Sequence, residues 1–186
     1  MASSEIWINA VRESVSGYRR MIDAAVSQLS DEELNRRPSI ECNSVAIILR
    51  HLAGNLQSRW TDFLTTDGEK PNRNRDAEFT DWPGDRESLM RYFEAGWKAL
   101  NDAIDLIATI DDSQTILIRG EKHTVADALV RSVTHLSYHA GQIQLIARGV
   151  HDGKWKWSTI APGKSSEHNA GTWGTSASRA IMGEKE

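Results

Sequence analysis

Residues 131–148, RSVTHLSYHAGQIQLIAR, contain two histidines, His135 and His139, and carry more chemical information than any other part of the sequence. Apolar residues recur through this stretch at spacings of three and four, which is the pattern of an amphipathic helix. Residues four apart on a helix lie on one face, one turn from each other, so both imidazoles can reach a single metal ion. The stretch therefore predicts a helix with two candidate metal ligands on one face, although histidines at this spacing alone are more often ordinary half-buried or surface residues.

The composition narrows the class of protein. A chain of 186 residues with a formal charge of −4 fits one globular domain and does not favour binding to nucleic acid or to an anionic membrane. The single cysteine, Cys42, excludes an intrachain disulfide and a cysteine-rich zinc site. No basic leader segment opens the sequence, and no run approaches the roughly 18 apolar residues of a membrane span. We expect a soluble, cytoplasmic protein.

Three further segments show the same helical stripe as the 131–148 stretch. They cover residues 5–29, about 43–63 and 85–109, and the helix that contains the two histidines should run from 124 to 148 and end at Gly149. Four amphipathic helices with one long connection are typical of a four-helix bundle. The fold class that we predict is therefore all-α.

Two short elements are expected between the long helices. Ser30 and Glu33 have the spacing of a capping box, which predicts a short helical turn that stops before Pro38. The sequence TILI at 115–118, followed by a turn at 119–122, predicts a small β-hairpin between the third and fourth long helices.

The long connection and the C-terminal end lack helical periodicity. Residues 65–84 are polar and rich in turn formers, and such a loop fits a solvated crossover and a lid over a site equally well. The last residues are small and polar, so we expect a flexible tail at 171–186 after a single bundle domain at 1–170.

A two-histidine site needs a third ligand. His51 is the candidate, because no other histidine outside the 131–148 stretch lies on a long predicted helix. At 100° per residue, His139 and His135 lie about 50° and about 90° from the centre of their apolar stripe, and His51 occupies a similar shoulder. No glutamate follows His135, so the His-Glu-x-x-His motif of zinc proteases is absent.

Three blocks of the sequence, NSVA at 43–46, HLAGN at 51–55 and HLSYHAGQI at 135–143, resemble the DinB-like superfamily of small bacterial four-helix bundles. Residues 59–76 and 155–165 look like an uncharacterised branch of that superfamily. The resemblance covers about residues 5–168 and is most specific in the YHAGQI block.

The resemblance implies a metal site. Members of the superfamily place one histidine of the second helix and two of the last helix around a divalent metal, which maps onto His51, His135 and His139. Three imidazoles suit zinc or nickel best, with iron, copper or manganese as alternatives, and leave positions open for water or substrate. The residues expected to support the ligands or line the pocket are Asn55, Tyr138 and Gln142.

The resemblance also implies two classes of function. Characterised relatives include thiol-dependent transferases and a thiol-dependent isomerase, so we expect a metal-dependent enzyme whose partners are a small-molecule substrate and a low-molecular-weight thiol. A hydrolase is less favoured, because no general base stands beside the histidines. The alternative is a non-enzymatic, metal-stabilised binding or stress-response protein. In either case we expect a homodimer.

Overall fold

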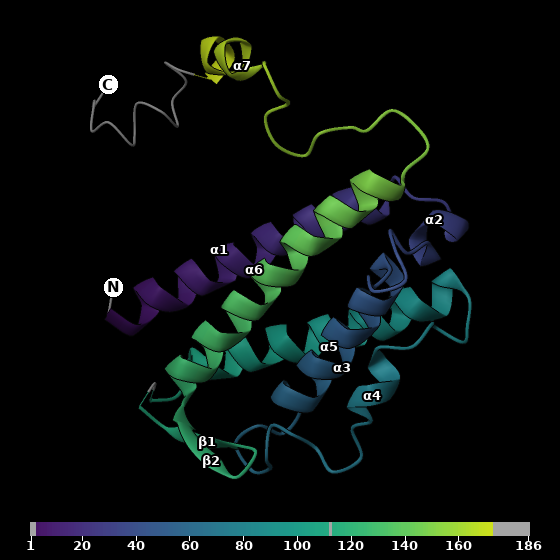
Figure 1. Ribbon diagram of the computed structural model, residues 1–186. Helices are drawn as coiled ribbons and strands as arrows, with labels where there is room; N and C mark the ends of the chain where they lie inside the picture. The colour runs from purple at the N-terminus through teal and green to yellow at the C-terminus, as the bar shows by residue number, and fades with distance from the viewer. Residues whose placement is uncertain (1–2, 112, 173–186) are drawn as a thin grey trace. The chain divides into compact units, whose positions relative to one another are not determined.

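The structure is a computed structural model that describes residues 3–111 and 113–172. The chain divides into two compact units, of which the first ends at Lys154 and the second begins at Trp155. The first unit confirms the predicted fold class: it is a helical bundle with one hairpin (Figure 1). Its long helices are α1 (Ser3–Val26), α3 (Val45–Trp60), α5 (Arg86–Ile107) and α6 (Val125–Val150).

The long helices pack in pairs, α1 along α6 and α3 along α5, and α3 also meets α6 (Figure 1). The α3–α5 crossing is close because Gly96 has no side chain: a Cβ there would lie 2.8 Å from the Cα of Ala53. Ion pairs of Arg19 with Glu94 and of Arg12 with Asp105 connect α1 to α5. Apolar side chains with no exposed surface form the core: Ile22, Leu49, Leu52, Leu56, Phe93, Leu100, Leu129, Leu136 and Ile143.

Side-chain caps begin three of these helices. Ser44, Asp85 and Thr124 each accept a hydrogen bond from the backbone N–H three residues on, which satisfies a donor that the first helical turn leaves free. The predicted end of the last helix at Gly149 was wrong. Gly149 lacks the positive φ of a helix-ending glycine, and the backbone N–H of His151 donates to Ala147, so the helix continues to Val150.

The short elements appear where the sequence predicted them. Helix α2 (Asp31–Asn35) begins with the predicted capping box of Ser30 and Glu33. Strands β1 (Thr115–Ile118) and β2 (Glu121–Thr124) form an antiparallel hairpin between α5 and α6. Its turn has two residues instead of the expected four, because Arg119 and Gly120 both adopt positive φ, at 56° and 76°.

The 65–84 connection holds a short helix that the sequence did not predict, α4 (Arg75–Glu78). The side chain of Asn74 accepts a hydrogen bond from the backbone N–H of Ala77 and so begins this helix. Helix α4 packs against α3, the helix that carries His51. The connection is therefore folded onto the bundle along part of its length.

The second unit contains helix α7 (Ser165–Thr172), which includes Gly171 and Thr172 of the predicted tail. Residues 173–186 lie outside the described residues, and both the single domain over 1–170 and the flexible tail stay predictions. Within the described part of the chain, no helix combines the length and apolar character that a membrane crossing requires.

Candidate metal centre

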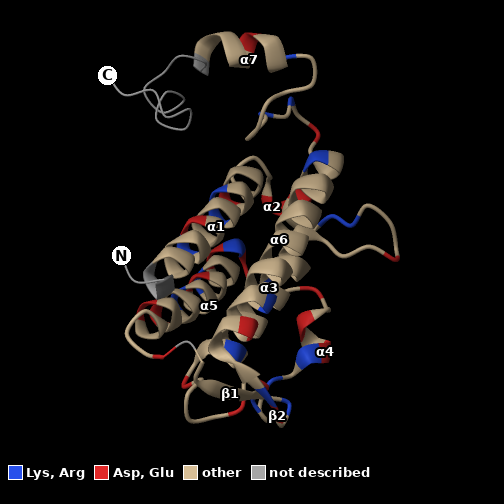
Figure 2. Ribbon diagram, turned by 90° about the vertical axis from the view of Figure 1, so that its left-hand side faces the viewer, with Lys and Arg blue, Asp and Glu red and all other residues tan. Residues whose placement is uncertain are grey.

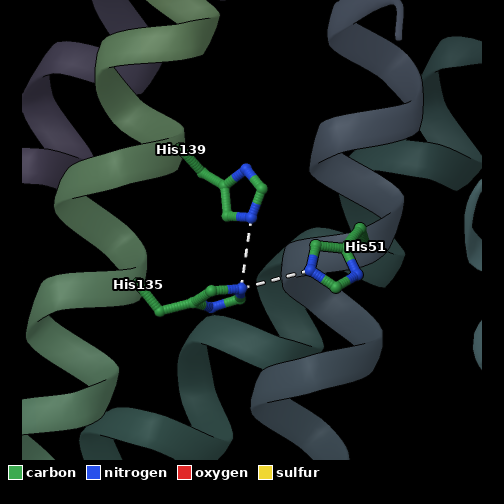
Figure 3. A group of neighbouring side chains, drawn as sticks. All are labelled: His51, His135 and His139. Carbon is green, nitrogen blue, oxygen red and sulfur yellow. Dashed lines mark hydrogen bonds between the residues drawn. The ribbon is translucent and has the colours of Figure 1, made fainter.

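Three histidines from two helices meet inside the first unit. His51 comes from α3, and His135 and His139 come from α6 one helical turn apart; Figure 3 shows their rings pointing toward one another. The Nε2 atom of His135 lies 3.2 Å from Nε2 of His51 and 3.1 Å from Nε2 of His139. His51 is 5% exposed and His139 is 8% exposed, while His135 is half-buried. The structure thus brings together the three residues that the sequence selected.

The spacing of these nitrogens matches a shared metal ion. A zinc–imidazole bond is about 2.0–2.1 Å long, so two ligands at a tetrahedral angle have nitrogens about 3.3 Å apart. The two Nε2 separations given above are close to that value. The ligand atoms of all three residues lie within 4.8 Å of one another, so the residues have the ligand type and the proximity to share one divalent metal.

Hydrogen bonds set the orientation of two of the three rings. Nδ1 of His51 lies 2.9 Å from Oε2 of Glu78, and Nδ1 of His139 lies 2.8 Å from Oε1 of Gln142. Carboxylate and amide oxygens only accept hydrogen bonds, so the neutral form of either histidine carries its proton on Nδ1. The lone pairs of both Nε2 atoms then face the centre of the cluster, as metal ligation requires.

The cluster has too few N–H protons to give every Nε2 lone pair a hydrogen bond. Nε2 of His135 is within hydrogen-bond distance of two Nε2 lone pairs, and it has at most one proton to donate. Nδ1 of His135 is itself buried and has no partner within the described residues. A bound cation would accept all three Nε2 lone pairs at once, so the donor set fits a metal better than it fits a hydrogen-bonded cluster.

Burial keeps two imidazoles of the cluster, those of His135 and His139, neutral. Burial lowers the pKa of His135 to about 3, and the neighbouring His139 and His51 lower it further. Burial likewise lowers the pKa of His139 to about 4, with a contribution from His51. Neutral imidazole is the form that binds a metal, so these two candidate ligands need lose no proton near neutral pH.

Glu78 contacts the histidine cluster, and the sequence did not predict this. Its carboxylate accepts the His51 hydrogen bond and two hydrogen bonds of 2.7 Å from the guanidinium of Arg73. Burial alone would raise the pKa of Glu78, but the hydrogen bonds from Arg73 and His51 hold it below its ordinary value. The carboxylate therefore stays ionised beside His51. The only feature of the sequence that pointed toward Glu78 is the length of its loop. No helical periodicity relates Glu78 to α3.

The three predicted supporting residues lie around the cluster in different ways. Gln142 contacts His139, as described above, and the ring of the exposed Tyr138 packs edge-on against the same histidine with centroids 4.9 Å apart. Asn55 is half-buried and lines a cavity next to His51. Within the described residues it forms no hydrogen bond with a histidine of the cluster. A role for any of the three in a reaction stays a prediction.

A cavity of about 550 Å³ gives access to the cluster. Its walls include His51 and His135, together with Asn55 and Tyr138. A volume of this size accommodates a small molecule, and three protein ligands leave coordination positions that such a molecule can reach.

Comparison with known proteins places the chain in a family. The family model described as "Protein of unknown function (DUF1572)" matches residues 2–164. No curated protein matched the chain, and no solved structure matched it. Because the match spans most of the sequence and the whole of the histidine cluster, the protein belongs to the DUF1572 family.

Proposed function

We propose that the protein binds one divalent transition metal through His51, His135 and His139 and uses it in a thiol-dependent transfer reaction on a small molecule. The observation that carries this proposal is the convergence of three Nε2 atoms beside a cavity of ligand size. The resemblance of the 51–55 and 135–143 blocks to the DinB-like superfamily supports the same conclusion. Zinc and nickel fit three imidazoles best, with iron, copper and manganese as alternatives.

The protein's own residues prepare the site for such a reaction. Glu78 and Gln142 fix the rings of His51 and His139 through their Nδ1 atoms, and burial keeps His135 and His139 neutral. When bound, the metal would supply a Lewis acid that lowers the pKa of a thiol. In the transfer the thiol S–H bond breaks, the sulfur forms a bond to carbon of an electrophile that releases its leaving group, and the proton passes to solvent.

The cavity favours a thiol over water as the nucleophile. Its walls, as far as the described residues show, contain no aspartate or glutamate. Glu78 lies next to the cluster, but its carboxylate is already engaged by Arg73 and His51. A hydrolase needs a group that takes a proton from water, whereas a thiol ionises readily enough without one.

The test is a conjugation assay of metal-loaded protein with a panel of low-molecular-weight thiols and electrophiles. We expect turnover in the wild type and none in His135→Ala. The control is His168→Ala, which removes an exposed histidine of α7 outside the cluster and should leave turnover unchanged. Metal bound by the wild type without turnover across the panel would contradict the transferase and favour the non-enzymatic alternative, a metal-stabilised binding or stress-response protein. The homodimer and the cytoplasmic location remain proposals beside this one.

A further inference from the structure

Five arginines line the cavity that gives access to the histidines, and no acidic side chain of the described residues lines it. They come from α3, from the 65–84 connection, from the hairpin turn and from α6; Figure 2 marks lysines and arginines in blue on these elements. The set is Arg59, Arg73, Arg75, Arg119 and Arg131. Segments far apart in the sequence thus place guanidinium groups around one space.

Arg59 is the most unusual of the five. It is 8% exposed, its Nε atom is buried, and that atom has no hydrogen-bond partner within the described part of the chain. Burial lowers the pKa of Arg59, and the positive charge of the nearby Arg131 lowers it further. A buried cation is ordinarily paired with an anion. Arg59 therefore lies in a place where a negative partner would be strongly favoured.

The other arginines divide into those with acidic partners and those without. Arg73 is paired with Glu78 and Glu69, and Arg119 lies 3.3 Å from Glu69. Arg59, Arg75 and Arg131 form no ion pair with any residue that the structure describes. Glu69 offsets part of the positive charge of Arg59, and Nη1 of Arg131 lies 3.5 Å from Nε2 of His123, but among the described residues no carboxylate contacts Arg59, Arg75 or Arg131.

We propose that this cavity binds the carboxylate or phosphate group of the small molecule, with Arg59 and Arg131 as its principal contacts. A guanidinium group matches such oxyanions with two parallel hydrogen bonds. The anion site stands on the cavity and the unpaired arginines, whereas its relation to a reaction rests on the proposed function.

The helices set the distance between the anion and the histidines. Arg131 precedes His135 by one helical turn of α6, about 6 Å along the axis, and Arg59 follows His51 by two turns of α3, about 12 Å. The ligand is therefore a small molecule whose anionic group lies toward the hairpin end of the cavity while another of its atoms approaches the histidines. Free inorganic ions should occupy only the arginine end.

Calorimetric titration of the full-length protein tests this, with inorganic phosphate and glutarate as probes at low ionic strength. The titration is made on metal-free protein, and zinc binding by each variant is measured separately. We expect saturable binding of at least one probe, weakened about tenfold or more in Arg131→Gln and in Arg59→Gln. Arg20→Gln removes an exposed arginine of α1 and should leave binding unchanged. The two probes distinguish a phosphate ligand from a carboxylate ligand.

The outcomes separate this inference from the metal site. Zinc binding retained and anion binding lost in Arg131→Gln supports the anion site, and the exposed position of Arg131 makes that variant informative even where the Arg59 variant fails to fold. Absence of saturable binding of both probes, or equal binding by wild type and Arg131→Gln, overturns the anion site and leaves the metal site untouched. Anion binding without zinc binding overturns only the proposed function.

Discussion

Oε2 of Glu78 lies 2.9 Å from Nδ1 of His51, which brings the 65–84 connection into contact with the histidine cluster. The carboxylate reaches α3 because Gly54 offers no side chain in its path: a Cβ at Gly54 would lie 2.7 Å from Cδ of Glu78. Arg73 donates a hydrogen bond to each oxygen of the same carboxylate. The connection therefore supplies an interaction that a plain crossover would not.

Glu78→Gln should weaken metal binding. The carboxylate orients His51 and increases its basicity, and loss of such a partner typically lowers metal affinity 10–100-fold. Competition with a chromophoric zinc chelator gives the affinity. Glu41→Gln, which removes an exposed carboxylate before α3, is the matched control and should bind as the wild type does. Equal affinity of Glu78→Gln and wild type would show that Glu78 only pairs with Arg73.

Gly54→Ala should weaken metal binding without touching a histidine. The added methyl displaces Glu78 from its present position, as the Cδ distance above shows. Gly17→Ala on α1 is the control, because the nearest atom to its Cβ would be 3.9 Å away, on the Arg20 side chain. That control should gain roughly 0.5–1 kcal/mol in free energy of unfolding. If Gly54→Ala bound zinc as tightly as the wild type does, the 65–84 connection would have to move freely relative to α3.

The metal-free protein should lose stability in mild acid. Its folded state keeps His135 and His139 neutral because burial lowers their pKa values to about 3 and about 4, whereas the ordinary histidine value is 6.5. Below the ordinary value the unfolded chain binds more protons than the folded chain, so the free energy of unfolding decreases as the pH falls. Urea unfolding in the presence of a chelator measures this between about pH 7 and about pH 5. The double variant His135→Gln/His139→Gln should show a shallower decline, and parallel curves would be inconsistent with the buried neutral pair.

Gly96→Ala should destabilise the bundle at the α3–α5 crossing. The new Cβ would lie 2.8 Å from both Cα and the carbonyl oxygen of Ala53, so backbone and not a flexible side chain must move. Overpacking of this kind typically costs about 1–3 kcal/mol. The urea midpoint at neutral pH measures the change. A midpoint at or above that of the wild type would show that the two helices separate easily.

The long helices were predictable because their own residues determine them. Periodic apolar positions such as Leu49, Leu52 and Leu56 predicted the buried face of α3, and the polar residues Ser44 and Asp85 marked where helices begin. The helix end at Gly149 was not predictable in this way. Glycine allows a helix to end but does not force it to end. Just beyond α6, the Glu33 carboxylate accepts a hydrogen bond from the backbone N–H of Asp152 and lies 3.1 Å from Nδ1 of His151, and these contacts stabilise the longer helix.

The histidines of the site were predictable for a similar reason, and their supporting carboxylate was not. His135 and His139 share a helix, so their spacing places them on one face, and His51 lies on a helix that packs against it. Glu78 reaches the site through a loop whose path depends on Arg73, Asn74 and the space left by Gly54. The arginines around the cavity could not be predicted as a group either. They come from four separate segments of the chain, which only the fold brings together.

The metal site is tested most directly by the metal content of the purified protein, measured by elemental analysis on the wild type and on His135→Ala. We expect a divalent transition metal, zinc or nickel foremost, bound at about one ion per chain in the wild type and lost in the variant. Removal of the metal should lower the melting temperature, and adding zinc or nickel should restore it, because a ligand bound only by the folded state stabilises that state. A wild-type protein that contains no transition metal, and whose melting temperature does not rise with zinc or nickel, would contradict the central claim.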